Sequence, residues 1–196
     1  CRLNTKVADI EIELLEEQAP KSGKERQVMP ELPVQVCIQN FQEVALGFTP
    51  EQALIEAERC LQCREPLCVD ACPVSVKIPQ FIQLIKAGDP AGAGRLIKTD
   101  NALPRVCGRV CPQEEQCEGA CILNRKGKPI AIGALERYVS DALAATEPQN
   151  QPSPKGTVFK AAMIGSGPAS LSCAGDLARA GVQVTVFEAF HDFGGV

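Results

Sequence analysis

Eight cysteines stand in two short runs, and their spacing is typical of iron–sulfur ligands. A cubane [4Fe–4S] core needs four thiolates aimed at its four corners. A loop with gaps of two to five residues can supply three of them while a remote residue supplies the fourth. The two runs read Cys60-x2-Cys63-x4-Cys68-x3-Cys72-Pro73 and Cys107-x3-Cys111-Pro112-x4-Cys117-x3-Cys121. Electron transfer is the chemistry that such cores carry.

The Cys-Pro dipeptide that ends the first run indicates that the two runs exchange ligands. In the bacterial ferredoxin run C-x2-C-x2-C-x3-C-P, the cysteine before the proline serves the other cluster. By the same logic Cys60, Cys63 and Cys68 bind one cluster, and Cys72 serves a second one. The eight grouped cysteines therefore predict two [4Fe–4S] clusters close together, and spacing alone includes Cys107 among their ligands.

Zinc is the alternative metal for these thiolates, because two four-cysteine sites could use them and C-x2-C is also a zinc-binding turn. Zinc sites usually pair two such turns, however, whereas only Cys60 and Cys63 form one here. Disulfides are the least favoured interpretation, since cysteines bunched at short spacings in an intracellular chain indicate metal. Cys1, Cys37 and Cys173 lie outside both runs, and Cys173 is expected to be a small core residue on an apolar helix face.

A glycine-rich turn near the C-terminus predicts a nucleotide site. The stretch Gly-Ser-Gly-Pro-Ala-Ser follows a predicted strand and opens a helix, and Glu188 ends the next strand. Gly165 and Gly167 let the backbone approach a pyrophosphate, whose charge is stabilised by the helix N-terminus at Pro168 and Ala169. Glu188 is expected to accept hydrogen bonds from ribose hydroxyls and to repel a 2′-phosphate, which favours FAD or NAD over NADP.

Three further glycine and serine positions bear on this interpretation. Gly194 and Gly195 follow the acid shortly afterwards, as is typical of FAD enzymes. Ser170 replaces the third glycine of G-x-G-x-x-G, but it is small enough to preserve helix–strand packing. The alternative is a βαβ unit that binds no nucleotide.

Helix signals around the cysteine runs predict a small α-helical domain over residues 40–145, with cysteine loops between its helices. Thr49 caps a helix that starts at Pro50, with Gln52 three residues after the cap. The expected helices run from 50 through Cys60, from 80 to 87 with Phe81, Ile82, Leu84 and Ile85 buried, from 90 to 98, and from 132 to 144 with Leu135, Val139 and Leu143 on one face. A buried strand over 158–164, a helix to Ala180 and a strand over 182–188 follow them.

These elements divide the chain into four parts. Residues 1–39 are expected to be a poorly structured extension or a docking arm, and residues 146–157 hold three prolines and almost nothing apolar, which indicates a linker. Residues 158–196 are expected to be the first βαβ portion of a Rossmann-like FAD-binding α/β domain, which follows the α-helical double-[4Fe–4S] domain. Because the chain opens with Cys1 and stops just after the second strand, we expect it to be a fragment of a longer protein.

Composition excludes several classes of function. A net charge of −4 argues against a nucleic-acid partner, whose phosphates need clustered Lys and Arg. No apolar run approaches the roughly 18–20 residues that cross a bilayer, and no secretory signal is present. A cytoplasmic location is therefore expected.

The motifs together resemble the small-subunit family of NADPH-dependent glutamate synthase. That family includes the large subunit of NADH-dependent ferredoxin:NADP oxidoreductase and the N-terminal part of dihydropyrimidine dehydrogenase, and the resemblance covers about residues 40–196. The matching text is Ala57-Glu58-Arg59-Cys60-Leu61-Gln62-Cys63, Cys72-Pro73-Val74, Ile78-Pro79-x-Phe81-Ile82, Leu103-Pro104-x-Val106-Cys107-Gly108-Arg109-Val110-Cys111-Pro112, Cys117-Glu118-Gly119-x-Cys121, Ile132-Gly133-x-Leu135-Glu136-Arg137-Tyr138, and the stretch from Gly165 to Gly195.

The resemblance implies a ligand set that differs from the one that spacing selects. One cluster takes Cys60, Cys63, Cys68 and Cys121, and the other takes Cys72, Cys111, Cys117 and a non-cysteine ligand, which is Glu136 here. Cys107 then becomes a neighbour of the cluster. A carboxylate ligand is harder and more anionic than a thiolate, so it is expected to change the potential of that cluster.

The resemblance also implies a function. The chain is expected to be the electron-transfer portion of an NAD(P)H-dependent flavoprotein oxidoreductase, in which electrons pass from NAD(P)H through FAD and the clusters to a partner subunit or domain. The nicotinamide site and any substrate pocket are expected to lie beyond Val196. The alternatives are a non-enzymatic iron–sulfur carrier or docking module and, third, a module organised by zinc.

Overall fold

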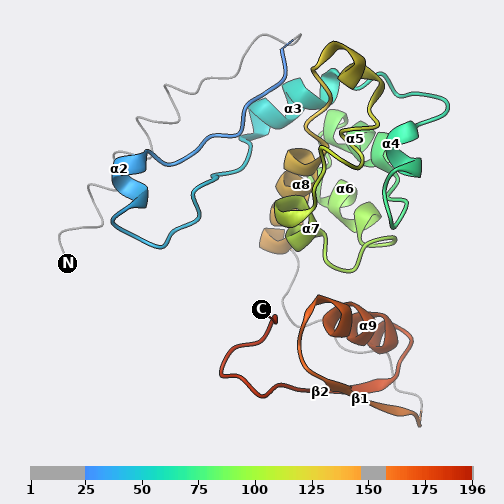
Figure 1. Cartoon of the computed structure of the whole chain (residues 1–196). Coiled ribbons are helices and arrows are strands. Elements are labelled where there is room, and N and C mark those ends of the chain that lie inside the picture. The colour runs from blue at the N-terminus through green and yellow to red at the C-terminus, as the bar shows by residue number, and fades with distance from the viewer. Residues whose placement is uncertain (1–24, 147–157, 196) are drawn as a thin grey trace.

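The computed structural model describes residues 25–146 and 158–195. The first range is helical and the second opens an α/β unit (Figure 1). The elements are α2 Val34–Cys37, α3 Pro50–Glu58, α4 Leu67–Asp70, α5 Ile78–Lys86, α6 Pro90–Ile97, α7 Pro104–Val110, the 3-10 helix η1 Ile122–Lys126, α8 Ile132–Thr146, β1 Lys160–Ile164, α9 Pro168–Arg179 and β2 Gln183–Phe187. Among these described residues, no helix combines the length and the apolar character that a membrane span requires.

The helix α3 begins as its sequence predicts. The Thr49 side chain accepts a hydrogen bond from the Gln52 backbone, and the Gln52 side chain accepts one from the Thr49 backbone, which completes a capping box. The prediction that this helix runs through Cys60 is wrong, because α3 ends at Glu58. Its last turn tightens there, with the Cys60 backbone N–H donating to the Ala57 carbonyl three residues back. Cys60 therefore starts a loop.

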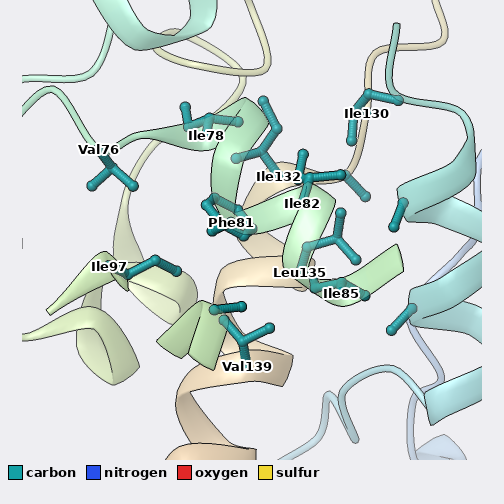
Figure 2. Close-up of a cluster of buried hydrophobic side chains, with 14 of the residues drawn as sticks. Val76, Ile78, Phe81, Ile82, Ile85, Ile97, Ile130, Ile132, Leu135 and Val139 are labelled. Carbon is teal, nitrogen blue, oxygen red and sulfur yellow. The ribbon is translucent and has the colours of Figure 1, made fainter. Parts of the chain in front are cut away.

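The core of the helical part lies between α5, α6 and α8. Phe81, Ile82, Leu135 and Val139 are fully buried, and Figure 2 shows them meeting from α5 and α8. Leu84 is only half-buried, so the prediction that it belongs to the buried stripe of α5 is wrong. The stripe is narrower because α5 packs on its neighbours with the side that carries Phe81, Ile82 and Ile85.

Two short helices carry cysteines that were expected in loops. Cys68 lies in α4 and Cys107 lies in α7. The helix α7 starts with Pro104 in its first turn and packs closely on α8 at Gly108. A Cβ atom at Gly108 would lie 2.7 Å from the backbone nitrogen of Arg137, so only glycine allows this approach. That approach brings the end of α7 next to the first turns of α8.

The stretch from 25 to 33 contacts the helical part. The Leu32 backbone N–H donates to the Val44 carbonyl at 2.8 Å, and the Leu46 N–H donates to the Pro30 carbonyl at 2.8 Å. The Leu32 side chain is buried. The predicted 1–39 extension therefore includes residues that pack on the helical domain. The rest of that extension, residues 1–24, and all but the first residue of the predicted linker lie outside the described residues.

The C-terminal part forms a β-α-β unit with two parallel strands. Its register pairs Lys160 with Gln183 and Ile164 with Phe187. The expectation of a buried first strand is wrong for the described residues, since Ile164 is 83% exposed. Cys173 is likewise exposed and does not contribute to a core. The physical reason is that, within the described residues 158–195, only α9 packs on this two-stranded sheet, and no residue of α9 is fully buried.

Candidate iron–sulfur sites and nucleotide-binding turn

Four cysteines from separate segments line one pocket of about 90 Å³, which we call the first site. They are Cys60, Cys63, Cys68 and Cys121. Cys60 and Cys63 belong to the loop after α3, Cys68 to α4, and Cys121 immediately precedes η1. The fold thus joins the last cysteine of the second sequence run to three cysteines of the first run.

The walls of the first site are mainly aliphatic. They include Ile78, Ile82, Ile130 and Ile132, which also belong to the core in Figure 2. Burial first, and then neighbouring thiols with Cys121 the strongest, raise the pKa of Cys60 and raise that of Cys68 to about 11. In the metal-free chain these groups are therefore protonated. Binding of iron as thiolates would release their protons.

A second site gathers Cys72, Cys107, Cys111 and Cys117 with Glu136. Cys107 and Cys111 lie in and just after α7, and Glu136 lies in α8, which α7 contacts. Burial raises the pKa of Cys111 to about 12, followed by the effects of Cys107, Glu136 and Cys72. Burial also raises the pKa of Cys117 to about 12, with smaller contributions that include Cys72 and Glu136. These groups are thus near enough to interact electrostatically.

Glu136 and Cys107 both reach the second site, and both contact the side chain of Asn101. The Asn101 Nδ2 donates to Glu136 Oε1 at 3.0 Å, and the Cys107 Sγ donates to Asn101 Oδ1 at 3.6 Å. Burial raises the pKa of Glu136 to about 7, although the hydrogen bond from Asn101 lowers it. Sequence reasoning missed Asn101. Its position directly after the turn 98–100 and three residues before Pro104 was the available signal for a side chain that bonds the nearby backbone.

A buried clamp, consisting of Glu56 with Arg59 and Glu118 with Arg26, holds the segment 128–133 that leads into α8. Glu56 accepts from the backbone N–H of Ala131 at 2.8 Å and from Arg59 at 2.5 Å. Glu118 accepts from the Gly133 N–H at 3.1 Å and from Arg26 at 2.6 Å, and both arginines donate to the Pro129 carbonyl.

This clamp reaches both sites. Arg59 directly precedes Cys60 of the first site, and Glu118 directly follows Cys117 of the second. Sequence reasoning missed the clamp, since charged side chains are usually solvent-exposed. The one signal was Glu56, which shares the helical face of Ala53 and Ala57.

The described cysteines are all free thiols, and among residues 25–146 and 158–195 no three His, Cys, Asp or Glu side chains are close enough to share a single metal ion. A [4Fe–4S] core is wider than one ion, so its four ligands stand farther apart. The donor sets fit such a core chemically, because thiolates suit iron–sulfur clusters and the carboxylate adds one hard oxygen.

The glycine-rich turn lies between β1 and α9. Gly165 has φ of +85° and Gly195 has φ of +90°, a backbone region in which other residues are strained. A Cβ at Gly195 would lie 3.0 Å from the Gly167 Cα, so the stretch 194–195 passes directly beside the turn. The Ser166 hydroxyl fixes that approach by accepting from the Gly194 N–H at 2.9 Å. The four glycines that the sequence singled out therefore lie together.

Glu188 is engaged by the chain itself. Its Oε2 accepts from the Ser166 N–H and hydroxyl at 2.8 and 2.5 Å, and its Oε1 accepts from the Ala189 and Phe190 N–H groups. These bonds, with the Ser166 side chain first, lower its pKa to about 2. A carboxylate has about four acceptor positions. A ribose hydroxyl would therefore have to replace one of these donors, and the ribose role of Glu188 stays a prediction.

Comparison with known proteins identifies the two parts. The model of the family described as dihydropyrimidine dehydrogenase domain II, 4Fe-4S cluster, matches residues 37–148, and that of the NAD(P)-binding Rossmann-like domain matches residues 163–196. The molecule is thus a helical iron–sulfur domain followed by the start of a nucleotide-binding domain. The chain belongs to the dihydropyrimidine dehydrogenase domain II 4Fe–4S family, so the family resemblance predicted from its motifs is confirmed.

Curated relatives carry the same arrangement at about 40% identity. The glutamate synthase [NADPH] small chain of Halomonas elongata is 39% identical over 172 residues, which is 87% of this chain and 36% of that protein. The protein of the same name from Escherichia coli is 41% identical over 85% of this chain and 36% of its own length. The NAD-dependent dihydropyrimidine dehydrogenase subunit PreT of Salmonella typhimurium is 41% identical over 76% of this chain and 37% of its own length. The chain thus spans little more than a third of these relatives.

Proposed function

We propose that this chain is the electron-transfer portion of an NAD(P)H-dependent iron–sulfur flavoprotein oxidoreductase. The observation that carries the proposal is the convergence of Cys60, Cys63, Cys68 and Cys121 on one apolar pocket, although they come from two separate sequence runs. The nucleotide-binding start in the same chain and the names of the relatives support it. When bound, [4Fe–4S] clusters exchange single electrons and FAD exchanges a hydride with NAD(P)H.

The ligand assignment for the first site is Cys60, Cys63, Cys68 and Cys121. The aliphatic walls of its pocket would exclude water from the cluster and lower the local dielectric. For the second site the assignment is Cys72, Cys111, Cys117 and Glu136, with Cys107 as a neighbour. Its support is the mutual electrostatic influence of these groups and the buried position of Glu136.

The glycine-rich turn is proposed to bind the pyrophosphate of FAD. Gly165, Gly167, Pro168 and Ala169 form the turn and the first turn of α9. The Gly165 N–H donates to the Phe187 carbonyl and Pro168 has no N–H, so the N–H groups of Gly167 and Ala169 are the ones that can receive a phosphate. Gly194 and Gly195 pass beside this turn. The ionised Glu188 would repel a 2′-phosphate here, which favours FAD over NADP at this site.

The proposed electron acceptor is a partner subunit or domain of the glutamate synthase large-subunit or ferredoxin reductase type. The support is that relatives are named as the small chain of glutamate synthase and as a subunit of dihydropyrimidine dehydrogenase. Both names denote one part of a larger assembly.

Anaerobic purification of the chain tests the proposal. Iron and inorganic sulfide should each be present at about eight per chain, with a broad visible absorbance that bleaches on reduction. A colourless protein that holds stoichiometric zinc and no iron, prepared without oxygen, would refute the proposal in favour of the zinc-organised module.

The ligand assignment has its own test. Glu136→Ala should lower the iron content from about eight to about four, whereas Cys107→Ser should leave both clusters in place. If Cys107→Ser removes the iron and Glu136→Ala does not, the second site uses four cysteines instead.

A non-enzymatic iron–sulfur carrier is the second candidate function. It is favoured by the four hydrogen bonds that already occupy the Glu188 carboxylate, since a ribose hydroxyl would have to displace one of their donors. Flavin content separates the two candidates. Binding of added FAD to the iron-loaded chain supports the flavoprotein. If the iron-loaded chain binds no FAD even when the proposed partner subunit is added, the carrier is supported.

A further inference from the structure

Asn101 lies between the two side chains that compete for the last ligand position of the second site. Its Nδ2 donates to Glu136 Oε1 at 3.0 Å, and its Oδ1 accepts from Cys107 Sγ at 3.6 Å. Asn101 is 7% exposed, so water has little access to either bond. A single amide thus contacts both candidates, one through each end.

The orientation of this amide is fixed by the backbone. The Leu103 N–H donates to Asn101 Oδ1 at 3.0 Å, in the turn that opens α7, and the Asn101 N–H donates to the Ile97 carbonyl at the end of α6. A backbone N–H can only donate, so it requires the oxygen end of the amide. The NH2 end must therefore point to Glu136.

The two ends of the amide favour different states of the two neighbours. The donor at Glu136 holds one carboxylate oxygen and leaves the other for a metal. The acceptor at Cys107 holds a sulfur that still carries its proton. A thiolate bound to iron has no proton to donate, so ligation by Cys107 would break this hydrogen bond.

We propose that Asn101 is a positioning residue that selects Glu136 over Cys107 as a ligand of the second site. The inference rests on the proposed iron–sulfur function, and it adds the reason why the nearby thiol of Cys107 is not a ligand. Asn101 does not touch the metal itself. It acts by holding Glu136 at the last ligand position of the second site and by holding Cys107 away from that position.

Replacement of the amide by a carboxylate reverses this selection. In Asn101→Asp the oxygen that accepts from Leu103 is retained, but a carboxylate group now faces Glu136 and repels it. Cys107 then takes the vacated position, because an iron–thiolate bond outweighs the single hydrogen bond that the retained oxygen still accepts from Cys107. The iron–oxygen bond to Glu136 breaks, an iron–sulfur bond to Cys107 forms, and the Cys107 proton passes to the released carboxylate, with no change in the number of electrons.

The test compares iron-loaded wild type with iron-loaded Asn101→Asp by alkylation with iodoacetamide and mass spectrometry. Cys107 should react in the wild type and should be protected about tenfold in Asn101→Asp, because a ligating sulfur does not attack the reagent. The electron paramagnetic resonance spectrum of the reduced protein should change for one of its two clusters. Adding Cys107→Ser to Asn101→Asp should then reduce the iron from about eight to about four, whereas Cys107→Ser alone retains about eight.

Asn40→Ser is the matched control, since the Asn40 Oδ1 also accepts from the N–H two residues later, at 2.8 Å, and the hydrogen bonds of Asn40 involve no residue of either site. It should alter neither Cys107 reactivity nor the spectrum. If Asn101→Asp does not fold, Asn101→Ser keeps an acceptor for the turn but is too short to reach Glu136. It should give the same protection of Cys107.

The outcomes separate this inference from the proposed function. Equal alkylation of Cys107 and an unchanged spectrum in both Asn101 variants would overturn the selection while leaving the iron–sulfur function intact. Protection of Cys107 in the wild type would also overturn it. A wild type without iron would overturn the proposed function, and the selection with it.

Discussion

At the first site four thiols meet in a pocket with isoleucine and leucine walls, whereas at the second site four thiols meet a carboxylate and an amide. The first set has no buried competitor among the residues that line its pocket, since Glu65, the carboxylate in that lining, is exposed. The second set has five candidate donors for four positions. Spacing groups three of the four thiols of the first site, Cys60, Cys63 and Cys68, but at the second site it cannot weigh a buried carboxylate against a thiol.

The two sites also differ in how tightly the buried clamp holds them. At the first site the clamp pairs Glu56 with Arg59, whose side chains are 0% and 5% exposed. At the second it pairs Glu118, at 9%, with Arg26, at 34%. Removal of one partner of a buried ion pair destabilises the fold more than removal from an exposed pair, because it leaves a buried charge without a counter-ion. The Glu56–Arg59 pair near the first site should therefore contribute more to stability than the Glu118–Arg26 pair.

Glu56→Gln should have the largest effect of the variants that compare the two sites. Glu56 accepts from the N–H groups of Gln27 and Ala131 and from Arg59, and a glutamine would direct its own NH2 at one of these donors. The buried Arg59 charge would also lose its counter-ion. We expect a loss of about 3–5 kcal/mol in the free energy of unfolding. The measurement is the urea unfolding curve of the iron-free protein.

Glu118→Gln is the matched variant at the second site. Arg26 can turn toward water, so the expected loss is only about 1–3 kcal/mol. Equal losses in the two variants would show that the clamp holds both sites alike and that the proposed difference in burial has no energetic consequence.

Much of this arrangement could be predicted from sequence, for identifiable reasons. The cap at Thr49 and the proline at position 90 act on neighbouring residues alone, so the sequence predicts correctly where α3 and α6 start. Cys107 was expected in a loop because α7 has only seven residues and is stabilised by its contact with α8 at Gly108. That contact joins residues far apart in the sequence, and no local pattern encodes it.

In the candidate sites, too, local features could be predicted from sequence and contacts between distant segments could not. The glycines of the nucleotide turn have local conformational requirements and were found, but the role of Ser166 in holding Glu188 and the 194–195 stretch depends on three segments meeting. Glu136 was found only through the family resemblance. Asn101 was not found at all, because its function depends on which groups the fold places at its two ends.

The pH dependence of the free energy of unfolding should also distinguish the two sites, with an effect of intermediate size. In the iron-free protein the pKa of Glu136 is about 7, raised by burial from 4.5. The folded state therefore binds this proton more tightly than the unfolded state. Its stabilising contribution is complete below pH 4.5 and is lost as the pH rises through 7, by about 3 kcal/mol in total. At the first site the pKa of Cys68 is about 11, so that thiol does not titrate in this range.

The measurement is the free energy of unfolding of iron-free wild type and Glu136→Gln across this pH range. Other carboxyl groups titrate in both proteins, so the difference between the two curves isolates Glu136. It should change between pH 4.5 and 7 and stay constant above that range. A difference that is constant over the whole range would mean that Glu136 does not titrate there. The second site would then resemble the first in having no group whose titration changes stability between pH 4.5 and 7.

The smallest effect is expected from the ion pair on the surface that joins the surroundings of the two sites. Lys77, at the start of α5, lies 2.6 Å from Asp100, which precedes Asn101, and the Lys77 side chain is 47% exposed. The hydrogen bond from Lys77 lowers the pKa of Asp100. Lys77→Met should therefore reduce the free energy of unfolding by less than about 1 kcal/mol at neutral pH. The loss should diminish in about 1 M salt, which screens exposed charges.

Urea unfolding of Lys77→Met at low and high salt measures this contribution against that of the clamp. A small, screened loss is the result expected if the clamp on segment 128–133 supplies most of the connection between the two sites, since the exposed pair then adds little. A loss above about 2 kcal/mol that persists in salt would exceed what an exposed pair supplies. The connection between the sites would then run through Asp100 and Asn101, and substitutions at Lys77 should also alter the reactivity of Cys107.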